Sequence, residues 1–219
     1  MRWTFLPALA GALGLSVAIA QADESAADWS GFYAGLSAGI ASVNDEFLGY
    51  PGMHGPWEPW AGGDNSGLTG GVQAGVNHQM DSVLLGLEAQ FLLTGIDGTA
   101  LSAFGRPPTR YEANWLASFG PRIGFVSGNA LLYAKGGLGI ADLDYTHSSS
   151  TGQNTAYGFT LGGGAEYAFT PNLSGRVDYT YFGFNADTTT LYQANGAAQT
   201  MVKHDPDAHV VTVGLNYHF

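Results

Sequence analysis

Apolar residues alternate with glycine, polar or charged residues along eight stretches of the chain. In the first stretch, residues 30–41, Phe32, Leu36 and Ile40 share one parity, and glycine and polar residues share the other. Because successive side chains of a β-strand point to opposite faces, this period of two predicts eight strands that each have one apolar face. The apolar parity of the later stretches includes Val76, Leu87, Phe119, Leu138, Leu161, Val177 and Val213.

Ionisable residues inside these stretches all fall on the opposite parity. A charged side chain on a lipid-facing surface costs about 2–4 kcal/mol at mid-membrane. This segregation is therefore typical of strands that face lipid on one side and an enclosed interior on the other. Because ionised groups in a confined interior need partners, we predict that the inward charges form a salt-bridge network. Its expected members are Glu88, Arg122, Lys135, Glu166, Arg176 and Asp178.

The connections between the stretches alternate between long and short. The long ones are residues 42–67, 94–113, 142–155 and 183–207, and the short ones are residues 79–82, 126–129 and 170–172. With short periplasmic turns, long external loops and an even number of strands, both termini lie in the periplasm. The pattern predicts an all-β fold, an eight-stranded antiparallel transmembrane up-and-down β-barrel.

The composition indicates a surface that is partly hidden from water. Charged residues make up 11% of the 219 residues, whereas soluble domains usually carry about 25%. No run after Ile19 reaches the ~20 apolar residues that a membrane helix needs. The chain has no cysteine, which excludes disulfides and thiolate metal sites. Its net charge of −11 argues against a nucleic-acid partner.

The N-terminus has the pattern of a secretory signal peptide, because Arg2 precedes an apolar stretch to Ile19 that contains no acidic residue. Small residues favour cleavage after Ala20, with Ala22 as a second candidate. A membrane anchor is the alternative, but the apolar run is short for one. We expect a signal peptide at residues 1–20, a periplasmic tail at 21–29 and the barrel at 30–219.

The first predicted strand opens with Trp-Ser-Gly-Phe-Tyr-Ala-Gly at residues 29–35, directly after an acidic exported tail. This opening, together with residues 131–137, 162–179 and 213–219, resembles the small alphaproteobacterial outer-membrane β-barrel family. That family includes the Brucella surface antigens and the Bartonella hemin-binding proteins, and it shares its architecture with the OmpA transmembrane domain. The resemblance covers nearly all of the mature chain and implies an outer-membrane barrel of the porin family.

The resemblance also gives a role to the C-terminus. In similar proteins an aromatic last residue, with apolar residues at alternate positions before it, looks like the signal read by the barrel-assembly machinery. Here Leu215, Tyr217 and Phe219 carry that pattern. One departure is Pro121, where similar proteins usually show a glycine or a basic residue. Because proline removes a donor from the ladder, we expect a bulge at Pro121.

Eight strands enclose a lumen just wide enough to be filled by side chains. We therefore expect a plugged interior, with a narrow porin-like channel as the alternative. The long loops carry aromatic residues and histidines that either pack over the barrel or bind a ligand. The hemin-binding relatives imply haem as a possible ligand, and a host surface molecule is another, although no ligand-spacing motif is present. The candidate contacts are His54, Trp57, Trp60, His147 and His204.

The sequence supplies no convincing enzyme site. His147 and the serines after it are residue types used by barrels that modify lipid A, but neighbours in one loop do not assemble a nucleophile, a base and an orienting acid. A soluble lipocalin-like barrel is the rival fold, yet its cavity would be apolar and its exterior charged. We expect an integral outer-membrane protein with a role in envelope structure and surface contacts, without a cofactor. Its expected partners are outer-membrane lipid, lipopolysaccharide and the barrel-assembly machinery.

Overall fold

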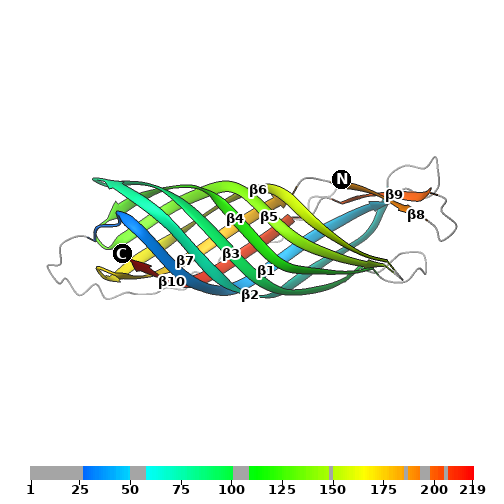
Figure 1. Cartoon of the computed structure of the whole chain (residues 1–219), viewed down its shortest axis with the longest axis horizontal. Helices are drawn as coiled ribbons and strands as arrows, with labels where there is room; N and C mark the ends of the chain where they lie inside the picture. Colours follow the sequence, from blue (N-terminus) through cyan, green and yellow to red (C-terminus); the bar gives the residue numbers. More distant parts are fainter. Residues whose placement is uncertain are drawn as a thin grey trace.

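The computed structural model describes residues 27–49, 58–100, 109–147, 150–184, 187–192, 198–204 and 207–219, and side chains within 27–43, 66–96, 113–142, 155–184 and 207–219. These residues form β-strands joined by tight turns (Figure 1). Within the described residues no helix is long and apolar enough to cross a membrane.

Eight antiparallel strands close into a barrel. Each pairs with the next along the chain, and the last strand, β10, pairs with both β7 and β1. The structure therefore confirms the predicted eight-stranded barrel. The wall strands are β1 Gly31–Gly49, β2 Glu58–Met80, β3 Val83–Ala100, β4 Thr109–Ser127, β5 Ala130–His147, β6 Ser150–Thr170, β7 Leu173–Phe184 and β10 Asp207–His218.

The three short turns lie at the barrel end that also holds Phe219, which we call the short-turn end. They span residues 81–82, 128–129 and 171–172, within the predicted short connections. Phe219 donates its backbone N–H to the carbonyl of Phe32 at 3.0 Å, so the two ends of the wall meet there.

The long connections differ from the prediction, because most of their residues are strand. β1 and β2 continue as a paired ladder to Gly49 and Glu58, although the loop was expected to begin at residue 42. The last connection contains a hairpin, β8 Asp187–Tyr192 and β9 Ala198–His204, and β9 pairs with the end of β1. Backbone ladders need no apolar side chains, so strands continue where the alternation that we used to find them has ended.

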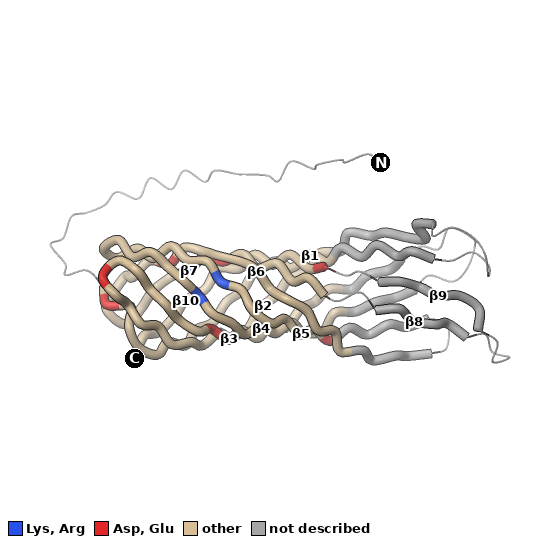
Figure 2. Tube along the Cα trace, turned by 90° about the horizontal axis from the view of Figure 1, so that it is seen from above, with Lys and Arg blue, Asp and Glu red and all other residues tan. Residues whose placement is uncertain are grey.

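The faces of the strands follow the predicted parity. Leu36 and Val213, on the predicted outer parity, are 68% and 58% exposed. Tyr33, on the inward parity of β1, is 2% exposed. All six of the charged residues assigned to the interior are buried. Figure 2 shows in blue the Lys and Arg residues whose side chains are described, part-way along the barrel.

The bulge that we expected at Pro121 is absent, so that prediction is wrong. Pro121 pairs in register with Leu87, and the ladder to β5 keeps one register on both sides of it, from Phe119 to Arg122. Proline has no backbone N–H to donate, and Pro121 has no partner in β5, but no extra residue is inserted in the strand. Shifts of register in β4 lie instead near Ala113, where the hydroxyl of Thr94 donates to the Ala113 carbonyl.

The outer face makes a test of the membrane assignment. Leu36→Arg should lower the free energy of unfolding by about 2–4 kcal/mol, because it places a charge against the hydrocarbon centre. Leu68→Arg is the matched control: Leu68 is also exposed but lies four residue pairs further from the short-turn end, where the cost falls to about 0–1 kcal/mol. Denaturant titration in lipid vesicles measures both, and equal small effects would contradict a lipid-facing wall.

Candidate functional site in the barrel lumen

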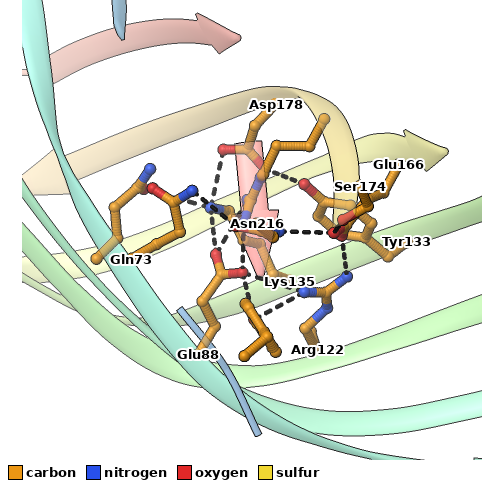
Figure 3. Close-up of polar contacts among 12 residues, drawn as sticks. Gln73, Glu88, Arg122, Tyr133, Lys135, Glu166, Ser174, Asp178 and Asn216 are labelled. Atoms are coloured by element: carbon orange, nitrogen blue, oxygen red, sulfur yellow. Dashed lines mark hydrogen bonds and ion pairs between the residues drawn. The ribbon is translucent and has the colours of Figure 1, made fainter. Parts of the chain in front are cut away.

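Glu88 of β3 is the centre of a polar network inside the barrel (Figure 3). Both carboxylate oxygens accept hydrogen bonds from Arg176 of β7, at 2.8 and 3.2 Å. Lys135 of β5 donates at 3.0 Å, and Arg122 of β4 at 3.2 Å. The hydroxyl of Tyr33 on β1 donates to the same carboxylate at 2.7 Å. One anion therefore holds three cations from three strands.

Asp178 of β7 shares two of those cations. Its carboxylate lies 2.8 Å from Arg176 Nη2 and 2.8 Å from Lys135 Nζ. The hydroxyls of Tyr133 and Thr180 also donate to it, at 2.7 and 2.9 Å. These pairs and hydrogen bonds fill most of the acceptor capacity of this buried carboxylate, as a buried polar group requires.

Glu166 of β6 extends the network toward the short-turn end. Arg122 Nη2 donates to it at 3.2 Å, while Ser174 and Asn216 donate at 2.5 and 2.6 Å. The Nε2 atom of His218 on β10 lies 3.4 Å from the same carboxylate. Glu166 thus links the charged centre to the last strand of the wall.

The structure brings all six predicted residues into this one network, and the charges balance as three acids and three bases. Each residue is at most 9% exposed. Tyr133 makes a cation–π contact with Arg122, whose guanidinium carbon lies 4.1 Å from the centre of the tyrosine ring. Tyr33, Tyr133 and Asn216 also belong to this network, and the sequence analysis gave them no role, because their acidic partners lie 45–55 residues away in the sequence.

Two apolar clusters of lumen side chains lie on either side of the network, and the sequence analysis missed both. The mouth layer is at the short-turn end, and the far layer is beyond the network. Within the strands their members share the inward parity of the polar residues, except Ala113, which lies beyond the shift of register in β4. At inward positions such as Leu92, the alternation of apolar and polar residues is therefore lost. The mouth layer is Trp29, Leu84, Val126, Leu131, Tyr133 and Ala168; the far layer is Ala41, Val43, Leu92, Ile96, Ala113, Leu116, Ala141, Phe182, Phe184, Ala208 and Val210.

The outer membrane protein beta-barrel domain family matches residues 8–219 of the chain. The chain belongs to this family. The 31 kDa outer-membrane immunogenic protein of Brucella melitensis is 30% identical to it over 87% of this chain and 84% of the relative. The 22 kDa outer membrane protein of Rhizobium leguminosarum is 29% identical, over 71% of this chain and 64% of that protein.

OprG from Pseudomonas aeruginosa has a similar fold. Its crystal structure aligns with a TM-score of 0.59 and 14% sequence identity, over 90% of this chain and 99% of OprG. Together with the Brucella and Rhizobium relatives, the family match assigns this chain to the outer membrane as a β-barrel protein.

The predicted assembly signal of this family member lies on the outer face. Leu215, Tyr217 and Phe219 are all exposed, and the rings of Tyr217 and Phe219 make an edge contact with centres 5.2 Å apart. The alternate spacing therefore places these three side chains in one apolar row on the outer face of the last strand, beside β1. Recognition by the assembly machinery stays a prediction.

The predicted loop contacts fall beyond what the structure describes in detail. His54 and Trp57 lie outside the described residues. Trp60, His147 and His204 lie on β2, β5 and β9, where only the backbone is described. Haem or host-ligand binding through these residues stays a prediction. Among the side chains that are described, no three His, Asp or Glu residues form a metal-binding group.

The network predicts a large loss of stability when its central anion is removed. Glu88→Ala should lower the free energy of unfolding by about 3–5 kcal/mol, because it leaves buried cations with too few partners.

A double-mutant cycle tests one pair within the network. Glu88→Gln combined with Lys135→Met removes one charge of each sign, so the double variant should be less destabilised than the sum of the two single variants. The excess should be about 0.5–3 kcal/mol in a double-mutant cycle of unfolding free energies. Strict additivity would mean that the two side chains do not interact.

Proposed function

We propose that this protein is a structural component of the outer membrane, with a lumen that does not conduct ions and an outer end that presents its strands at the cell surface. One observation carries the proposal: six balanced charges are paired inside the lumen, between the mouth layer and the far layer. We assign no catalytic activity and no cofactor to it.

The stacking of these layers supports a closed lumen. A hydrated ion that entered would lose water contacts among apolar side chains, where narrow constrictions exclude water. It would then have to displace cations such as Lys135 from carboxylates 2.8–3.0 Å away. Both steps are unfavourable, and the eight-stranded wall leaves little width to avoid them.

The strand extensions support the surface role. β1 and β2 pair as far as Gly49 and Glu58, beyond the part of the wall with an apolar outer face. The Brucella relative is named an immunogenic protein. By analogy, we propose that these extensions contact lipopolysaccharide, host molecules or neighbouring proteins. Export by a signal peptide at residues 1–20, and insertion by the assembly machinery through Phe219, belong to the same proposal.

The closed lumen predicts the result of planar-bilayer recording. The purified, folded barrel should give no reproducible conductance steps at either polarity. Glu88→Ala combined with Arg122→Ala is the matched variant, because it deletes one charge of each sign and two large lumen side chains. Discrete steps from the unmodified protein would contradict the proposal, whatever the variant does.

The proposed orientation predicts which segments antibodies reach. An epitope inserted at residues 148–149, between β5 and β6, should be detected on intact cells. The same epitope inserted at residues 81–82, in the short turn between β2 and β3, should be detected only after the outer membrane is permeabilised. The reverse result would mean that the barrel has the opposite orientation in the membrane, and the proposed surface role would then be wrong.

A further inference from the structure

Trp29 lies inside the barrel mouth, although the sequence analysis assigned it to the tail before the barrel. Its side chain is 1% exposed and belongs to the mouth layer with Leu84, Val126 and Leu131. The indole also meets the ring of His218 edge-on, with centres 5.3 Å apart. Residue 29 precedes the first strand, so its burial is not a result of strand pairing.

The backbone around Trp29 is held so that the ring is buried. The side-chain oxygen of Gln79, near the end of β2, accepts the Trp29 backbone N–H at 3.0 Å, and the Gln79 backbone donates to the Ser30 hydroxyl at 3.2 Å. Asp28 accepts the Ser30 N–H at 2.9 Å, and this hydrogen bond lowers the pKa of Asp28. Gly31 has φ +115°, a conformation that residues with a Cβ rarely adopt. The sequence Asp-Trp-Ser-Gly therefore folds as a hook at the mouth.

The position of the indole places it next to the charged network. His218, which the indole contacts, lies 2.9 Å from Ser174 and 3.4 Å from Glu166. Asn77, the strand partner of Gly31, is 4% exposed in the same part of the lumen. The ring of Trp29 therefore lies in the mouth layer and contacts a residue that reaches the network.

The indole nitrogen takes no part in holding the ring. Trp29 Nε1 is buried and has no hydrogen-bond partner among the described residues. The ring is therefore fixed by packing and by the backbone hook. A site that recognises an aromatic shape without a polar contact should accept phenylalanine, and it should lose its seal with alanine.

We propose that the barrel mouth is a built binding site for one aromatic ring, occupied by the chain's own Trp29, and that this ring is the stopper that separates periplasmic water from the charged network. The proposal rests on the closed lumen proposed above and names the group that closes its periplasmic side. Because the mouth layer would lose its largest member, removal of the ring opens a cavity beside His218 and Asn77.

The absence of cysteine from the chain makes the proposal testable by single-cysteine labelling. Asn77→Cys is the reporter, because neither polar atom of the Asn77 side chain has a hydrogen-bond partner in the described residues. It borders the network: a Cβ built on Gly86 would lie 2.4 Å from Asn77 Oδ1 and 3.2 Å from Arg122 Cγ. The probe is a charged, water-soluble methanethiosulfonate, applied to the full chain in detergent and in lipid nanodiscs.

With Trp29 present, the Asn77→Cys thiol should be protected. Trp29→Ala should raise its labelling rate by about ten-fold or more, because access no longer requires local unfolding of the mouth. Trp29→Phe should keep the protection and the thermal stability of the unmodified barrel. Free indole added to the Trp29→Ala protein should restore protection by filling the cavity, which keeps the test valid if the variant is merely less stable.

Ser37→Cys is the matched control. Ser37 is also buried, and its hydroxyl has no hydrogen-bond partner among the described residues, but it lies four residues further along β1 than Tyr33, on the far side of the network. It should stay protected when Trp29 is replaced. Rapid labelling of Asn77→Cys in the presence of Trp29, or equal labelling of both thiols after its replacement, would overturn the stopper. If the barrel conducts ions while its Asn77→Cys thiol is protected, the closed lumen is wrong but the role of Trp29 as a stopper is retained.

Discussion

The pairing of buried charges around Glu88 is the interaction on which the rest of this barrel depends. A carboxylate in this position, with three cations within 3.2 Å, is tolerable only because those cations neutralise it. The cations in turn need Asp178 and Glu166. With the interior neutral, the wall can stay narrow and its outer face can present apolar residues such as Leu36 to lipid. The lipid-facing surface and the filled lumen thus both depend on the pairing of the buried charges.

The network also joins strands that are distant in sequence. Every one of the eight wall strands contributes a side chain, and the contact between Gln73 of β2 and Asn216 of β10 spans 143 residues. The network is therefore complete only when the barrel is closed. Such non-local pairing is typical of proteins that fold slowly.

The sequence was sufficient to predict the eight-stranded barrel and the faces of its strands, because lipid imposes a strict parity on residues such as Leu36 and Glu88. It did not predict that Arg122 bridges Glu88 and Glu166, since parity gives the direction of a side chain and not its partner across non-adjacent strands. Leu92 and Phe182 were missed because an apolar lumen residue breaks the same alternation that identifies a strand. Pro121 shows the limit of a local rule: losing one donor did not require an inserted residue.

The hairpin of β8 and β9 has a consequence for how this protein can evolve. The ladders that close the wall, β10 with β7 and β10 with β1, run through residues 173–183 and 33–44 and use no residue of the hairpin. The hairpin is joined to the rest of the sheet only at the end of β1, through three residue pairs in the described chain. Its length and sequence can therefore change during evolution without the loss of any residue pair that closes the wall.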